Sequence, residues 1–238
     1  MLHIFLKELK TFFSTAIGYI VIGLFLLATG LLLWLFPGNS NIIDSGYASL
    51  DALFNIAPWL YLFLCPAVTM RMIAEERQTG TIELLLTKPI SKWEIVLGKL
   101  LAGWVVVFLA LLPSLIWLVS VAMLAENGVD YGAFWGSWIG LLFLALVYLS
   151  VGLFGSTLSK NQIVVFIVSA AICFALYYGF ELVGSLASGG VAYFLRNFGI
   201  HAHYESIARG VIDSRDIVYF LLISFVFSLA SKWNLSRH

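Results

Sequence analysis

MRMIAEERQTGTIELLLTKPISKWEIVLGKL, residues Met70 to Leu100, is the stretch that decides how this chain is organised. It holds nine charged residues of a 238-residue chain that has only 13 basic and 13 acidic ones. Soluble domains have about 25% charged residues, whereas this chain has 11%, with 61% hydrophobic residues and a mean hydropathy of +0.99. We therefore expect an integral membrane protein in which this polar block joins two membrane-spanning segments.

The uncharged runs on either side are long enough to cross a bilayer. A spanning helix needs about 20 apolar residues, because each residue adds about 1.5 Å across a hydrocarbon core of about 30 Å. The runs are apolar on every side, while transmembrane strands alternate every second residue. The sequence thus predicts an all-α bundle of six spanning helices in a single transmembrane domain, residues 1–238. The runs are 17–36, 52–70, 101–125, 131–159, 161–180 and the shorter 217–231.

Lysine and arginine residues are distributed unequally between the two sides of this predicted bundle. Ten lie on the side of the termini and of the 71–99 connection, and three lie on the other side. Cytoplasmic segments carry the excess of positive charge. The sequence therefore predicts a multi-pass protein of the inner (cytoplasmic) membrane with both termini in the cytoplasm.

Two segments are expected to lie along the membrane surface. Residues 1–13 form an amphipathic pattern in which Lys7, Glu8 and Lys10 would face lipid headgroups, with a solvated charged tail as the alternative. Residues 184–216 are too apolar for a free external loop and contain several glycines. We expect this segment to dip into the outer leaflet as a re-entrant segment, or to lie along it as short helices.

The polar connection between the second and third spans is expected to form a bent helical hairpin. Its first turn, Glu75 to Arg77, would face water, and Gly80 would allow a change of direction before Thr81 caps a new helix. Pro89 disfavours helix at the residue before it, and Ser91 with Glu94 forms a capping-box pattern. A contiguous apolar patch near the tip suggests a partner, and a helix resting on lipid is the alternative. The patch consists of Ile82, Leu84, Leu85 and Leu86.

A stripe of glycines on the fourth span predicts a close helix contact. Gly132, Gly136 and Gly140 recur every four residues, which leaves one helix face smooth. Packing within the bundle is the favoured interpretation, and contact with a second permease subunit is the alternative. Cys65 and Cys173 fall inside predicted spans and predict no disulfide framework.

Motifs for catalysis, metal binding and nucleotide binding are missing from the sequence. There is no phosphate-binding G-x-x-x-x-G-K-[ST] loop, no H-E-x-x-H and no G-x-S-x-G. His201, His203 and Glu205 lie close together, but interfacial polar residues explain them better than a metal site. The sequence predicts neither a catalytic residue, a metal site or a bound cofactor in this chain nor a nucleic-acid partner.

The string EERQTGTIELLLTKPISKWEIVLGK resembles the signature of ABC-2 type (type V) ABC transporter permeases. Further strings are similar to the gliding-motility-associated permease subunit of Bacteroidota. These are MLHIFLKELKTFFSTAIGYIV, APW, PAVTMR, STLSKNQIV and RGVIDSRDIVYF. The resemblance extends over essentially the whole chain.

The resemblance implies the membrane subunit of an ATP-driven transporter, most simply an exporter within a gliding-motility-type system. A separate cytoplasmic ATPase dimer would bind ATP and magnesium, and a second permease copy or a paralogue would complete the pathway in the lipid bilayer. ATP can drive motion only by favouring one conformation over another. The implied coupling residues are Glu75, Glu76, Arg77, Gly80, Thr81, Glu83, Leu84, Leu85, Leu86 and Pro89, with Lys7, Glu8 and Lys10 of the interfacial helix.

Other functional classes fit the sequence less well. A channel would be expected to show polar rings along its spans, and these are sparse. An intramembrane enzyme would need polar groups converging within the bundle. A non-transporting scaffold stays open as an alternative.

Overall fold

The computed structural model describes residues 1–87, 89–125, 128–186, 189–210 and 213–236. Within these ranges all regular structure is helical and there is no strand. Six helical segments are long and apolar enough to cross a membrane, which confirms the predicted architecture. These segments are Ala16–Leu35, Asp51–Gln78, Lys92–Leu124, Tyr131–Ser156, Gln162–Leu186 and Ser214–Leu235.

The first half of the chain forms the first two spans, the hairpin that follows the second span, and the beginning of the third span. An extended residue, Thr15, separates the first two helices, and the Asn41 side chain accepts hydrogen bonds at the start of the short third helix. The elements are α1 (Leu2–Ser14), α2 (Ala16–Gly30), a π-helical turn (Leu31–Leu35), α3 (Ile42–Ser45), α4 (Asp51–Thr69), α5 (Ala74–Gln78), α6 (Thr81–Leu86) and α7 (Lys92–Leu111).

The third span continues beyond a break at Pro113, where the missing N–H interrupts the helix. The elements from there on are α8 (Ser114–Leu124), α9 (Tyr131–Ser156), α10 (Gln162–Phe174), a π-helical turn (Ala175–Gly179), α11 (Phe180–Leu186), α12 (Gly190–Phe198), α13 (Ile200–Ala208) and α14 (Ser214–Ser236).

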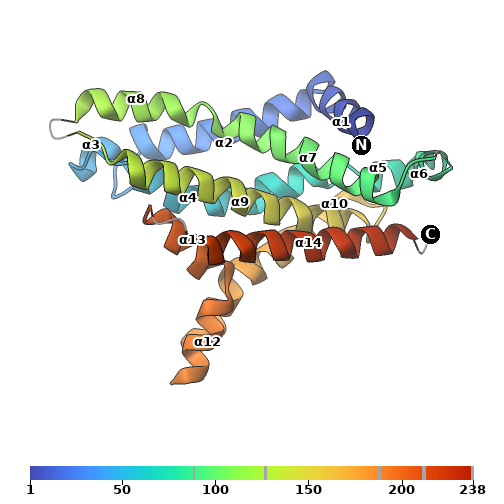
Figure 1. The fold of residues 1–238 in the computed structure, drawn as a ribbon. Coiled ribbons are helices and arrows are strands. Elements are labelled where there is room, and N and C mark those ends of the chain that lie inside the picture. Colours follow the sequence, from blue (N-terminus) through green and yellow to red (C-terminus); the bar gives the residue numbers. More distant parts are fainter. Residues whose placement is uncertain (88, 126–127, 187–188, 211–212, 237–238) are drawn as a thin grey trace.

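The spanning helices lie roughly side by side along one long axis (Figure 1). The start of α1, the hairpin of α5 and α6, and the end of α14 lie at the same end of the bundle, while α3 and the end of α8 lie at the opposite end. Helix α12 projects sideways from the bundle. Short helices thus occupy the described part of the predicted external segment.

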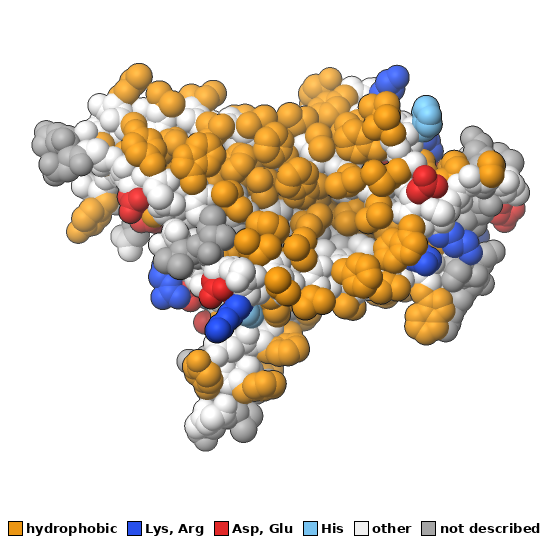
Figure 2. All heavy atoms as spheres, in the orientation of Figure 1, with side chains coloured by type: hydrophobic (Ala, Val, Ile, Leu, Met, Phe, Trp, Pro, Cys, Tyr) orange, Lys and Arg blue, Asp and Glu red, His pale blue; other side chains and the backbone are white. Residues whose placement is uncertain are grey.

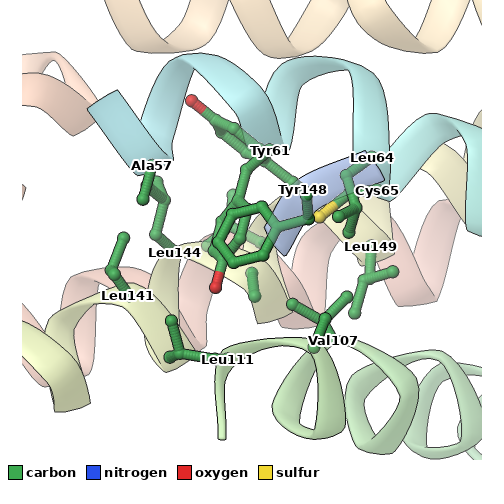
Figure 3. Packing of buried hydrophobic residues seen from close by; sticks show 14 of the residues in the cluster. Ala57, Tyr61, Leu64, Cys65, Val107, Leu111, Leu141, Leu144, Tyr148 and Leu149 are labelled. Atoms are coloured by element: carbon green, nitrogen blue, oxygen red, sulfur yellow. The ribbon is translucent and has the colours of Figure 1, made fainter. Parts of the chain in front are cut away.

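The core is centred on α9, the most buried of the six spans, with 72% of its most apolar window inside the protein. Its neighbours α4 and α7 direct side chains toward it (Figure 3). Tyr61 and Cys65 of α4, Val107 of α7, and Leu144 and Tyr148 of α9 have no exposed surface. Both cysteines are buried and free.

Small residues let other helices approach α9 closely. A Cβ atom at Gly152 would overlap the Thr69 hydroxyl of α4, and one at Gly155 would overlap the Ser169 hydroxyl of α10. Apolar side chains gain little by leaving lipid for protein, so close backbone approach is a main source of helix association in membranes. These two glycines therefore set the spacing of α4 and α10 around α9.

Hydrophobic side chains cover much of the exposed surface of the bundle (Figure 2). The spans formed by α2, by α10 and α11, and by α14 have only 22%, 22% and 28% of their apolar windows buried. Faces of this kind require lipid or another protein chain, because water would not solvate them.

The spanning helices extend beyond the uncharged runs of the sequence. The last one, α14, begins at Ser214 and places Asp216 in its first turn. The third begins as α7 at Lys92, directly after the predicted cap at Ser91, and includes the buried Lys99. Charged residues end the apolar runs in the sequence without ending the helices.

A clash test follows from the contact between α4 and α9. We expect Gly152→Val to destabilise the protein by about 1–3 kcal/mol, because overpacking forces helices apart. Gly23→Val is the matched control, since nothing lies within 4 Å of a Cβ there. Melting followed by tryptophan fluorescence in detergent should show a lower Tm for Gly152→Val only. Equal melting temperatures would contradict the proposed role of Gly152.

Candidate functional site

The most distinctive polar structure is the hairpin between α4 and α7. After α4 ends at Thr69 the chain makes a tight turn and continues as α5, which is one and a half turns long. Gly80 then adopts φ +72°, a left-handed conformation that favours glycine. It reverses the path into α6, and Ser91 starts α7 with the predicted capping box, in which its hydroxyl accepts from the Glu94 N–H.

The cap predicted at Thr81 is wrong. Gly80 is the residue preceding α6, and no side chain caps this helix. The Thr81 hydroxyl instead lies 2.9 Å from the hydroxyl of Thr79 and also bonds to the Glu76 carbonyl. These bonds close the turn between α5 and α6.

Lys99 of α7 lies under the hairpin with no exposed side-chain surface. Its ammonium donates to Glu8 of α1 at 2.7 Å and to the carbonyl of Met72 at 2.6 Å, and lies 3.0 Å from Glu76 of α5. Lys7 donates to the other oxygen of Glu76 at 2.8 Å. Two positive and two negative side chains therefore form one cluster, which we call the buried charge cluster: Lys7, Glu8, Glu76 and Lys99.

The buried charge cluster affects the pKa of Lys7, its most exposed member. Partial burial alone would lower the pKa of Lys7, but the hydrogen bond and the charge of Glu76, together with the charge of Glu8, outweigh it. The net effect is a pKa of Lys7 above its ordinary value. Lys7 therefore stays positively charged and completes a neutral cluster.

The other side of α5 is attached to the end of α9. The Ser156 hydroxyl accepts hydrogen bonds from the N–H groups of Ile73 and Ala74, both at 3.0 Å. Arg77 donates to the carbonyl of Thr157, which also accepts from the side chain of Asn234 at 2.9 Å. These bonds satisfy N–H groups that the start of a helix leaves free.

Comparison with protein families identifies this architecture. A family model described as ABC-2 family transporter protein matches residues 42–209, well over half of the chain and including the hairpin. This chain belongs to the ABC-2 transporter family. It is a permease subunit of an ABC transporter, a component that is not itself an ATPase and that implies a partner ABC ATPase. No curated protein matches the chain significantly.

Only some of the predicted coupling residues lie at the surface of the permease. Thr81, Glu83 and Pro89 are exposed, and Ile82 and Leu85 are half-buried. The side chains of Leu84 and Leu86 lie outside the described part of the chain, as does all of Lys88. Glu75 is partly exposed and pairs with Arg71 at 2.9 Å, one turn away.

Two expectations about charged residues are wrong. Glu76 and Arg77 do not form a water-facing turn, because Glu76 points into the buried charge cluster and Arg77 bonds to the end of α9. Glu8 does not face headgroups, because it is only 6% exposed. Lys7 and Lys10, by contrast, lie on the exposed side of α1.

Sequence reasoning missed Lys99 and Ser156 as parts of this site. The spacing of Ile4, Glu8 and Phe12 was a usable signal, because these three residues form the buried face of α1. A carboxylate within an apolar row of a helix requires a buried partner. No comparable signal marked Ser156, which lies at the end of an apolar helix.

The glycine stripe on α9 packs against the external segment. A Cβ at Gly136 would lie 2.7 Å from Gly210, and one at Gly140 would lie 2.9 Å from the side chain of Ile207. At Gly132 a Cβ would meet only Asp130 of its own helix start. Gly136 and Gly140 thus pack against residues of their own chain, while Gly132 is exposed.

The histidines at the far end of the permease pair with separate carboxylates. His201 lies 3.2 Å from Glu181, and His203 lies 2.7 Å from Asp216, with Tyr219 stacked on its ring. Among the described residues no three metal-binding side chains come together. These pairs join α13 to α11 and to α14.

Removing the Lys99 charge tests the importance of the buried charge cluster for stability. We expect Lys99→Met to destabilise the permease by about 3–5 kcal/mol, because it leaves Glu8 and Glu76 buried with only Lys7 as counter-ion. Lys10→Met on the exposed face of α1 is the control, with an expected change within about 0.5 kcal/mol. Thermal unfolding in detergent measures both. Indistinguishable melting curves would show that the buried charge cluster contributes little.

Proposed function

We propose that this permease couples ATP binding and hydrolysis by a separate ABC ATPase dimer to export of a substrate across the inner membrane. In this proposal ATP and magnesium bind only in the partner, and the hairpin of α5 and α6 receives its motion. The observation that carries the proposal is an exposed hairpin tip whose base is anchored by buried polar contacts to α1 and α7. An anchored tip can transmit force, whereas a loose loop would absorb it.

The position of the hairpin supports contact with a partner in the cytoplasm. The start of α1, the end of α14 and α6 lie at one end of the bundle (Figure 1). The sequence assigns ten of the thirteen lysines and arginines to the side of these segments, which favours the cytoplasm. We infer that both termini and the hairpin are cytoplasmic.

The exposed apolar faces support assembly with a second permease copy or a paralogue. Six spans make up half of the transporter that the family resemblance implies. The faces of α2 and α10 leave most of their apolar surface uncovered within one chain. A second subunit would cover part of this surface and lipid the remainder.

An amphiphilic substrate suits the apolar surface between the outer helices. A groove of about 360 Å³ lies between α2, α4 and α10, and its described lining is apolar. Hydrocarbon fits such a groove better than a polar solute, which would lose its hydration there. The sequence similarity to gliding-motility-associated permeases supports a role in such a system.

Reversing one charge at the hairpin tip tests the partner surface. We expect Glu83→Lys to reduce retention of the ATPase during purification about tenfold, a change that corresponds to about 1.4 kcal/mol of binding free energy. Glu205→Lys, an exposed reversal on α13 at the other end, should leave retention unchanged. Wild-type retention by Glu83→Lys would argue against this surface.

Labelling from outside the cell tests the orientation. After Cys65→Ala and Cys173→Ala, a single cysteine introduced by Glu83→Cys should resist a membrane-impermeant maleimide in whole cells and react after lysis. Tyr47→Cys, at a residue that is 77% exposed near α3, should react in whole cells. The opposite pattern would place the hairpin outside and exclude an ATPase contact.

A further inference from the structure

We propose that α1, the hairpin of α5 and α6, and the first turns of α7 form a single rigid unit, with Lys99 as the positioning residue that holds it together. This inference rests on the proposed function and goes beyond it in one respect. The push received at the hairpin would move the N-terminal helix as well, and Glu76 would act inside the permease instead of at the ATPase surface.

The acceptors around Lys99 come from three separate segments. Glu8 belongs to α1, Glu76 belongs to α5, and the carbonyl of Met72 belongs to the turn that precedes α5. The side chains of Glu8 and Glu76 are only 8% and 12% exposed. The ammonium group of α7 thus joins α5 and the turn directly before it to α1, which is remote from both α5 and α7 in the sequence.

Separating these charges would be costly. Charges in a low-dielectric interior attract strongly, and a partner removed without replacement leaves a buried charge unsolvated. The buried charge cluster is neutral as a whole, so it is stable only while its members stay together. Motion of α5 away from α1 or α7 would first have to hydrate Lys99.

Further contacts fasten α1 to the start of α7. The amino group of Met1 lies 3.0 Å from Glu94 in the first turn of α7. A Cβ at Gly98 would lie 3.2 Å from the side chain of Ile4, so these two helices touch closely. With Glu8 and Lys99, these contacts run along one face of α1 and prevent it from sliding.

The contacts of α5 with α9 are of a different kind. Ser156 and Thr157 offer only uncharged oxygens to α5, and in the described part of the chain no ion pair joins these two helices. Water can replace hydrogen bonds of this kind at the end of a helix. The boundary between α5 and α9 is therefore where the rigid unit can move against the rest of the bundle.

Distances between spin labels in the intact complex of permease and ATPase test this inference. Labels on cysteines at His3 of α1 and Glu83 of α6 report on the rigid unit, and a second pair at Glu83 and Lys160, which precedes α10, reports on its motion. All three positions are exposed, and Cys65→Ala and Cys173→Ala remove the native thiols. Double electron–electron resonance is recorded in nanodiscs without nucleotide and with magnesium and a non-hydrolysable ATP analogue.

We expect the distance from residue 83 to residue 160 to change with nucleotide while the distance from residue 3 to residue 83 stays constant. If the distance from residue 3 to residue 83 changes as much as the distance from residue 83 to residue 160, the rigid unit does not exist and the inference is overturned. If neither distance responds to nucleotide, the proposed ATP coupling through the hairpin fails, and this inference fails with it.

Variants separate the positioning role of Lys99 from a role in stability alone. In Lys99→Met, and in the milder Glu8→Gln should the first variant fail to fold, the distance from residue 3 to residue 83 should become dependent on nucleotide. Arg215→Met, which removes an exposed charge near the start of α14, should behave as wild type. A lower Tm with an unchanged distance response would overturn the positioning role.

Discussion

A lysine with no exposed surface must find its partners inside the protein, and this requirement organises one end of the permease. The Lys99 ammonium contacts a carboxylate of α1, a carboxylate of α5 and a carbonyl of the turn before α5. Apolar contacts would allow these segments to shift against one another, because such contacts have little directional preference. The ion pairs do not allow this, since each displacement would leave a charge without solvation. The hairpin therefore has a defined position relative to the N-terminal helix.

The rest of the bundle is assembled by close packing around α9. Gly152 and Gly155 admit Thr69 and Ser169 into contact with its backbone, and Ser156 at its end receives the N–H groups of α5. Lipid offers apolar side chains almost the same environment as the protein interior, so small residues and hydrogen bonds carry much of the association. In the proposed ATP coupling, the firmly packed centre would stay fixed and the anchored hairpin would move.

Much of the fold followed from the sequence by simple arguments. The six spans were predictable because hydrocarbon thickness sets the length of a helix, and the capping box at Ser91 and Glu94 was predictable because it involves neighbouring residues only. The lengths of the uncharged runs alone do not mark the ends of the spanning helices, because charged residues at a membrane edge can continue a helix as readily as end it. The partners of Glu8 and Glu76 were not predictable either, since Lys99 is remote from Glu8 in sequence.

By itself, the sequence determined that this is a helical membrane protein with a polar hairpin between its second and third spans. Composition and run length suffice for this, because the bilayer leaves backbone groups no other way to be satisfied. Only the tertiary structure decided which charges of the hairpin face solvent and which are internal. Burial depends on the packing of α1, α5 and α7 together, and a charged side chain in the sequence looks the same in either environment.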